Sequence, residues 1–197
     1  MDGTYPAGTR LTELEVAAAL GMSRTPVREA IRTLAADGLV GPAGWGVTVV
    51  ALESDDLDHA YQVRAVLDGL AAEQAADRQR TGRIAPADLV GLRAAAAAAA
   101  EATAAGRLHQ AVEHNRGFHR RIAELAGNPI ALAMLDRLWD QILVSTLHSL
   151  AAPARPSQVA AQHDQLLAAI ADGRVAEAAR IARQHALDTR ASAQEES

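Results

Sequence analysis

Four polar side chains fall at core positions of helices predicted in the second half of the chain. Asn115 and His119 lie four residues apart, and therefore on one face of a helix. His163 and His185 each interrupt the apolar stripe of a later helix. A single inward histidine is usually a hydrogen-bonded core residue, but four buried polar groups are costly unless they satisfy one another or share a ligand. Because neutral imidazoles from several helices are typical ligands of a divalent transition metal, we predict a metal site at these four residues.

Zinc is the metal that three imidazoles favour most, and nickel or manganese are alternatives. A metal-dependent hydrolase or lyase would use the same three histidines. Such an enzyme would also need a carboxylate base beside the metal. Glu113 and Glu124 flank the motif but fall off the inward stripe, so no catalytic residue is predicted.

A second group of residues that could bind a ligand is the set of arginines near the N-terminus. Gly21 ends one short helix, and Ser23 or Thr25 can cap the next. On that next helix, Arg28 and Arg32 project beside an apolar stripe that includes Val27, Ile31 and Leu34, and Arg24 stands at its start. This pattern is typical of a DNA recognition helix, although a surface helix with a solvated charged flank has a similar pattern.

The elements that must position these residues follow from periodicity. After Gly38 the pattern alternates, which predicts two short strands, 39–40 and 47–50, around a glycine-rich tip that carries Trp45. A tryptophan in such a hairpin is more often a core residue of a small domain. From Asp56 onward the chain is helical, with helices predicted at 56–80, 86–105, 107–126, 130–150, 157–171 and from the Asp172-Gly173 break to about 191.

Composition limits the classes of function. The 197 residues have a net charge of −5, which disfavours a protein that coats nucleic acid indiscriminately but not a small reading domain. The chain has no cysteine, which excludes disulfides and thiolate metal sites. No leader-like apolar run and no stretch of about 18 apolar residues is present, so a cytoplasmic location is expected.

The string from Ser23 to Ala30, Ser-Arg-Thr-Pro-Val-Arg-Glu-Ala, followed by Gly38-Leu39-Val40, closely resembles the winged helix-turn-helix signature of the GntR superfamily of bacterial transcription regulators. The resemblance implies a homodimer that binds double-stranded operator DNA. The DNA-binding residues that it implies are Ser23, Arg24, Thr25, Arg28, Arg32 and the wing glycine Gly46. The family usually has a basic residue before that glycine, where this chain has Trp45, whose indole could still pack on sugar edges.

Three segments of the helical part resemble the FCD-type effector-binding domain of the FadR branch: residues 115–119, 162–164 and 184–185. The resemblance implies that Asn115, His119, His163 and His185 bind a metal, although the family more often has aspartate at the first position. It also implies that a small carboxylate effector is bound near the metal by Arg64, with Tyr61 beside it. The alternative for Arg64 is a buried ion pair with Asp68, four residues on.

The sequence therefore predicts a mainly α protein in two domains. Residues 1–52 form a small α+β winged helix-turn-helix, and residues 53–197 form an all-α antiparallel bundle of about six helices. The predicted function is sequence-specific transcription regulation, controlled by a metabolite at the metal-containing site, rather than catalysis. A metal-buffering or structural helical protein remains an alternative, but it leaves the motif at residues 23–30 unexplained.

Overall fold

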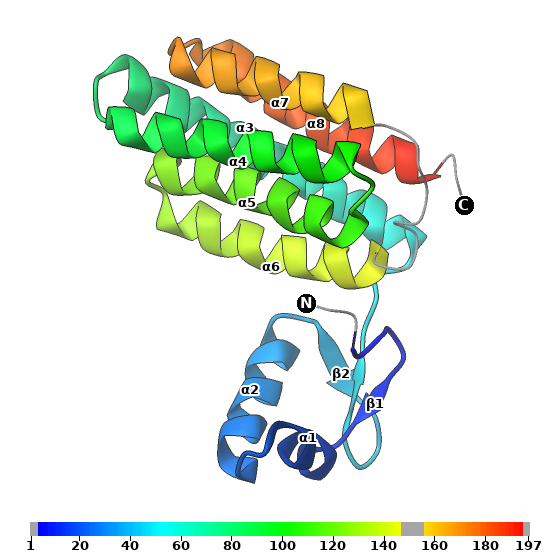
Figure 1. The fold of residues 1–197 in the computed structure, drawn as a ribbon. Helices are drawn as coiled ribbons and strands as arrows, with labels where there is room; N and C mark the ends of the chain where they lie inside the picture. The colour runs from blue at the N-terminus through cyan, green and yellow to red at the C-terminus, as the bar shows by residue number, and fades with distance from the viewer. Residues whose placement is uncertain (1–3, 147–155, 195–197) are drawn as a thin grey trace. The chain divides into compact units, whose positions relative to one another are not determined.

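The computed structural model describes residues 4–146 and 156–194. The elements, in chain order, are β1 (Arg10–Leu11), α1 (Glu13–Leu20), α2 (Arg24–Ala36), β2 (Val40–Pro42), β3 (Val47–Val49), α3 (Ser54–Arg80), α4 (Pro86–Ala104), α5 (Leu108–Ala126), α6 (Pro129–Thr146), α7 (Pro156–Ala171) and α8 (Val175–Gln194) (Figure 1). The described residues group into two compact units. One contains the N-terminal elements up to Leu57 and the end of α6 from Trp139, and the other contains the remaining helical residues.

The two helices of the N-terminal unit begin and end at local signals in the sequence. A capping box starts α1, because Glu15 N donates to Thr12 Oγ1 at 3.2 Å and Thr12 N donates to Glu15 Oε2 at 3.0 Å. Gly21 ends α1 with a φ of 63°, a conformation that glycine adopts without strain. Ser23 is the N-cap residue of α2, although its side chain makes no capping hydrogen bond. The predicted helix-turn-helix is therefore confirmed.

A three-stranded antiparallel sheet of order β1-β3-β2 completes this unit. The two wing strands are confirmed, with Val40 opposite Val49 and Pro42 opposite Val47. The sequence did not predict β1, which is only two residues long and lies in a turn-rich segment. Gly46 allows this strand to approach, because a Cβ there would lie 2.3 Å from the carbonyl oxygen of Leu11.

The apolar stripe of α2 is less buried than its spacing predicts. Val27 is 3% exposed, but Leu34 is 37% exposed and Ile31 is only half-buried. The three short strands offer one small apolar surface, so only the first turn of α2 is fully covered. The apolar stripe of this helix is therefore buried at its start and exposed towards its end.

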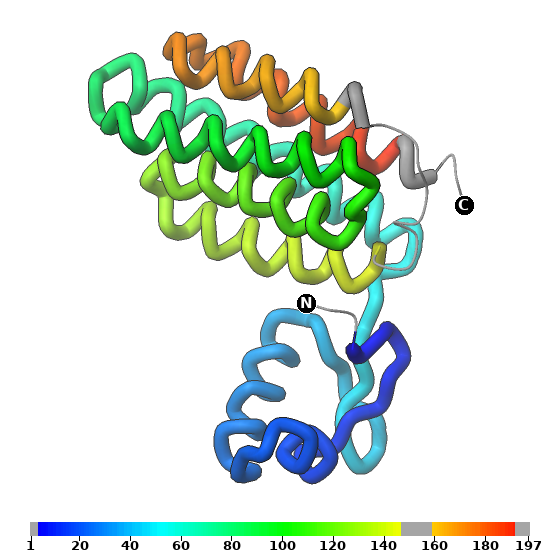
Figure 2. Tube along the Cα trace, in the orientation of Figure 1, coloured from blue at the N-terminus to red at the C-terminus, as the bar shows by residue number. Residues whose placement is uncertain are grey.

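The helical unit is an all-α bundle, as predicted. Helix α4 packs against α5 and α7, and α7 packs against α8, as the ribbon and the tube both show (Figures 1 and 2). Fully buried side chains fill its interior, among them Leu92, Phe118, Leu135, Leu166 and Ile170. The six predicted helices match α3 to α8 within a few residues, except that the predicted end near residue 150 lies outside the described residues. Within the described ranges no helix is long and apolar enough to span a membrane.

Candidate functional site

The three predicted inward histidines converge in the interior of the bundle. His119 on α5, His163 on α7 and His185 on α8 are each 3% exposed or less. The ring centroid of His119 lies 5.2 Å from that of His163 and 4.8 Å from that of His185. The centroids of His163 and His185 are also 4.8 Å apart. One nitrogen from each ring lies within 4.8 Å of the others, a spacing that suits a single metal ion.

Two ring nitrogens of this cluster, and one amide oxygen a helical turn before His119, are unsatisfied among the described residues. The Nε2 atoms of His119 and His163 are buried without a hydrogen-bond partner, and so is Oδ1 of Asn115. Buried nitrogen and oxygen atoms without partners destabilise a fold by about 1–3 kcal/mol each. A divalent metal accepts these same lone pairs, so the donor set of this chain fits such an ion.

The outer contacts of His185 fix its orientation. Nδ1 of His185 lies 2.8 Å from Oε1 of Gln162, and Nε2 of Gln162 donates to Oδ2 of Asp188 at 2.7 Å. Gln184 donates to the other oxygen of Asp188, also at 2.7 Å. A ring nitrogen bound in this way directs the opposite nitrogen inward, as in most histidine metal sites. Sequence reasoning missed the role of Asp188, which no spacing signal in the sequence reveals.

Burial keeps the cluster neutral. Desolvation lowers the pKa of His163 to about 4, with a smaller contribution from the positive charge of Arg64. Desolvation also lowers the pKa of His119 well below its usual value, with the other two histidines and Arg64 adding to the effect. Neutral imidazoles are the form that binds a metal, so both rings are prepared for one at neutral pH.

Arg64 lies close to the histidines and forms the ion pair that was one of its two predicted roles. Its Nε donates to Oδ2 of Asp68 at 3.1 Å, and both side chains are at most 5% exposed. Desolvation raises the pKa of Asp68 despite this partner. Tyr61 is also buried, and its ring centroid lies 5.5 Å from Cζ of Arg64. Only Nε of the guanidinium is used in this pair, which leaves both terminal nitrogens of Arg64 for a second anion.

In the N-terminal unit, Arg24 and Arg28 are joined by a residue that sequence reasoning missed. Glu13, at the start of α1, accepts two hydrogen bonds from Arg28, at 2.7 and 2.9 Å, and one from Arg24 at 3.1 Å. These bonds, first from Arg28 and then from Arg24, lower the pKa of Glu13 to about 2. Glu13 lies in the first turn of α1, where acidic residues are favoured by the helix dipole, so its position in the sequence does not indicate a partner for the arginines.

The remaining predicted DNA-binding residues lie on the same unit. Ser23 and Thr25 are exposed at the start of α2, and Arg32 is exposed and pairs with Glu29 at 2.8 Å. Trp45 is 93% exposed at the tip between β2 and β3. The expectation that this tryptophan is a core residue is therefore wrong, because a glycine-rich tip places it beyond the small sheet.

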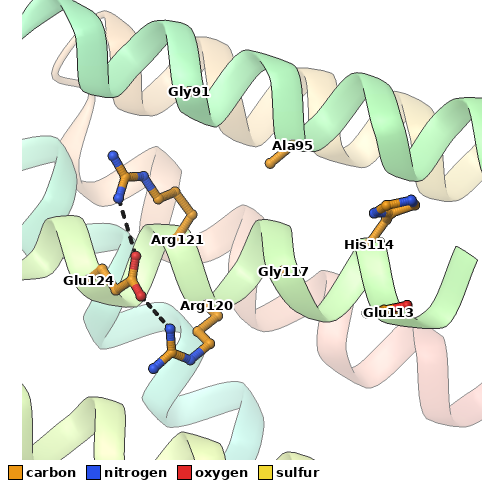
Figure 3. Close-up of a pocket in the computed structure, with 8 residues that line it drawn as sticks. All are labelled: Gly91, Ala95, Glu113, His114, Gly117, Arg120, Arg121 and Glu124. Atoms are coloured by element: carbon orange, nitrogen blue, oxygen red, sulfur yellow. Dashed lines mark hydrogen bonds and ion pairs between the residues drawn. The ribbon is translucent and has the colours of Figure 1, made fainter. Parts of the chain in front are cut away.

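A groove of about 390 Å³ lies between α4 and α5 (Figure 3). Figure 3 shows Glu124 between Arg120 and Arg121 on one side of it, with His114 and Glu113 towards the other. Arg121 also pairs with Asp88 at 2.6 Å. Its arginines already have partners, and its glutamates lie on the surface, as their off-stripe positions predict.

Two family models match separate parts of the chain. Residues 1–49 match the model of the gntR family of bacterial regulatory proteins, and residues 59–188 match the FCD domain. The second match covers the three histidines, and the first covers the recognition helix.

Individual relatives are regulators. The chain is 33% identical over 150 residues to a protein of Paenarthrobacter nicotinovorans named "Probable D-xylose utilization operon transcriptional repressor", covering 76% of this chain and 62% of that protein. It is 30% identical over 138 residues to the HTH-type transcriptional regulator McbR of Escherichia coli, covering 70% of this chain and 60% of McbR. These alignments span less than two thirds of either relative.

The fold is similar to the solved structure of E. coli McbR/YncC, with a TM-score of 0.86 at 25% identity over 98% of this chain and 90% of that one. The members of the matched family are transcriptional regulators rather than enzymes. The chain therefore belongs to the gntR family of bacterial regulatory proteins and carries an FCD domain.

Proposed function

We propose that the chain binds operator DNA as a cytoplasmic homodimer, and that a small carboxylate effector bound at a metal centre in the bundle controls this binding. The observation that carries the proposal is that, among the described residues, Nε2 of His119 and of His163 are buried without a partner in the three-histidine cluster. Oδ1 of Asn115, one helical turn before His119, is likewise unpartnered. A metabolite-controlled regulator requires such an interior ligand site, which DNA binding alone does not.

Four protein ligands are proposed for the metal: Asn115, His119, His163 and His185. Zinc suits three imidazoles best, and nickel and manganese are the alternatives. A bound divalent ion supplies open coordination positions for a carboxylate oxygen. Arg64 would bind the other end of the effector through its terminal nitrogens, while Tyr61 supports the guanidinium.

For the DNA-binding unit, we propose that Arg24 and Arg28 read base edges while Glu13 holds them in position. A guanidinium fork matches the two major-groove acceptors of guanine. Arg32 is proposed as a phosphate contact because it lies a turn deeper, with Ser23 and Thr25 at the helix start and Gly46 in the wing as further DNA-binding residues. Two copies would place two recognition helices at half-sites about one helical turn apart.

Control requires that the effector distinguish between two arrangements of the dimer. The effector would draw α5, α7 and α8 towards a common centre. The N-terminal unit, called the reading unit below, is joined to α3 by a short linker. A shift of α3 would therefore change the spacing of the two recognition helices in the dimer. A ligand with different affinities for the two spacings changes operator affinity by that ratio.

A binding titration tests the proposal. The probe is the DNA upstream of the chain's own gene, and anisotropy is measured at several salt concentrations with zinc-loaded and chelator-treated protein. We expect sequence-selective binding that survives moderate salt, and an affinity that small carboxylates change only in the zinc-loaded protein. Equal affinity for this DNA and a scrambled duplex contradicts the DNA function, and an effector response without metal contradicts the control mechanism.

A further inference from the structure

A second pocket, of about 530 Å³, opens at the end of the bundle where α3 and α5 end and α6 and α8 begin. Its volume is within the range of small-ligand sites in proteins. The residues that carry the argument are Glu73, Gln74 and Arg78 on α3, and Gly127 after α5. Two of its charged side chains, those of Arg78 and Glu73, have no hydrogen-bond or ion-pair partner among the described residues, unlike the arginines of the groove between α4 and α5.

Arg78 is the first of these groups. Among the described residues its guanidinium makes no hydrogen bond or ion pair, and its Nε is buried. The nearest acid on the same helix is already shared, because Asp77 pairs with Arg80 at 2.6 Å and with Arg83 at 3.8 Å. A buried N–H donor without an acceptor destabilises the fold, and a guanidinium binds anions such as carboxylates well. An anionic ligand would therefore satisfy Arg78.

Gly127 makes room for the guanidinium and restricts its position. A Cβ on Gly127 would lie 3.1 Å from Nη1 and 3.2 Å from Cζ of Arg78. The φ of Gly127 is 70°, so a side chain there would be strained as well as crowded. The guanidinium therefore rests against bare backbone at the wall of the pocket.

Acceptors without donors lie one turn earlier on the same helix. Oε1 of Gln74 is buried without a hydrogen-bond partner. The carboxylate of Glu73 makes no ion pair with any described residue. Gln74 precedes Arg78 by four positions and so lies on the same face of α3. Glu73 lines the pocket as well.

We propose that this pocket binds a small zwitterion of the α-amino acid class. Its carboxylate would be held by Arg78, and its ammonium by Glu73 and Oε1 of Gln74. A simple carboxylate would leave Glu73 and Gln74 unpaired, an amine would leave Arg78 unpaired, and a phosphate would be repelled by Glu73. A zwitterion satisfies all three groups and adds no net charge.

This site is separate from the histidine cluster. Arg78 is 14 residues beyond Arg64 on α3, which corresponds to about 21 Å along a helix. The inference therefore does not rest on the metal centre.

Calorimetric titration of the full chain tests the inference. The probes are alanine, leucine and phenylalanine, each paired with its analogue that lacks the amino group: propionate, isocaproate and hydrocinnamate. We expect at least one amino acid to bind with a Kd at or below about 1 mM, and its partner acid to bind at least about tenfold more weakly. Absence of saturable binding by all three amino acids at about 10 mM overturns the proposal.

Variants locate the binding. Arg78→Gln should weaken it by at least about tenfold, and Glu73→Gln should abolish the preference for the amino acid over its partner acid. Arg93→Gln, at an exposed arginine on α4 outside the pocket, should bind as the original chain does. Circular dichroism and thermal melts establish that each variant is folded. Unchanged binding in a folded Arg78→Gln protein, or an equal loss of binding in Arg93→Gln, overturns the proposal.

Discussion

The arginines of α2 and the histidines of the bundle differ in exposure and in how their polar atoms are partnered. Arg28 is 45% exposed in its side chain and already has a partner in Glu13, whereas His119 and His163 are buried and keep an unpartnered Nε2. Exposed ion pairs contribute little to stability, so the pair with Glu13 orients Arg28 with little effect on the free energy of unfolding. A buried imidazole has no exchange with water, so an internal ligand is the partner that fits it.

This difference separates two kinds of functional residue. In the N-terminal unit, Glu13 gives Arg24 and Arg28 a partner from the chain itself. The bundle has no substitute for its ligand among the described residues. We expect ligand removal to change the bundle greatly and the reading unit little.

The largest expected effect is on metal content. His163→Ala should lower metal affinity by more than about 100-fold, because it removes one inward donor and leaves a cavity beside the other two. His114→Ala, at an exposed histidine on the same helix as His119, is the matched control and should retain metal. Metal analysis after dialysis measures both.

A charge substitution tests the same site in the opposite direction. Asn115→Asp should raise metal affinity by about tenfold, because it replaces a neutral oxygen with an anionic one. Stoichiometric metal in His163→Ala, or an Asn115→Asp protein with unchanged affinity, would contradict the proposed ligand set.

The next effect is the pH dependence of the metal-free protein. Unfolded histidines titrate near ~6.5, whereas the pKa of His163 in the fold is about 4. Between these values the unfolded state binds more protons, so stability is fully present above about pH 6.5 and falls as the pH is lowered towards 4. At pH 5 His163 alone should account for a loss of about 2 kcal/mol, and His119 adds to it in the same direction.

Urea denaturation at a series of pH values measures this loss. A matched His163→Leu variant should show a shallower decrease between pH 6.5 and 5, because the unfolded chain then has one less group to protonate. A metal-free protein whose free energy of unfolding is constant over this interval would show that the histidines are not held neutral by burial.

A smaller effect is expected in the reading unit. Arg28→Ala should weaken operator binding by about 5- to 150-fold if Arg28 reads a base, while leaving metal content unchanged. Arg32→Ala should instead reduce the slope of the salt dependence by about 1 with little change in sequence preference. Glu13→Gln should reduce discrimination between operator and random DNA, because the two arginines lose the group that orients them. An Arg28→Ala protein that folds and binds operator normally contradicts the assignment.

The features that the sequence predicts correctly are set by residues close together in the chain. Helix boundaries followed from local signals such as the capping box at Thr12 and the terminating Gly127, which act within a few residues. The three histidines were visible because each interrupts an apolar stripe, a property of one helix at a time.

The unpredicted features depend on distant residues. Glu13 meets Arg28 from 15 residues away, and Gln162 meets His185 from 23 residues away, through packing that no periodicity encodes. Strand β1 forms only because β3 offers it a partner. The exposure of Leu34 and Trp45 depends on how far the small sheet extends, which the spacing of apolar residues does not determine.

Trp45 is the residue where the comparison can be tested with the smallest effect. It is apolar, like the bundle core, but is 93% exposed like the arginines, so it contributes little to the stability of the fold. At the wing tip its indole could pack on sugar edges in the minor groove, where inserted apolar side chains are common. Trp45→Ala should therefore weaken operator binding about fivefold without changing the free energy of unfolding. Trp45→Arg should recover affinity and raise the salt slope by about 1, because it adds a phosphate contact. Tryptophan emission during an operator titration measures this contact directly. Trp139, the other tryptophan, is only 5% exposed, so a change in emission on DNA binding should come from Trp45. If operator addition leaves the emission unchanged and Trp45→Ala alters self-association instead, the exposed indole faces a second copy of the chain rather than DNA.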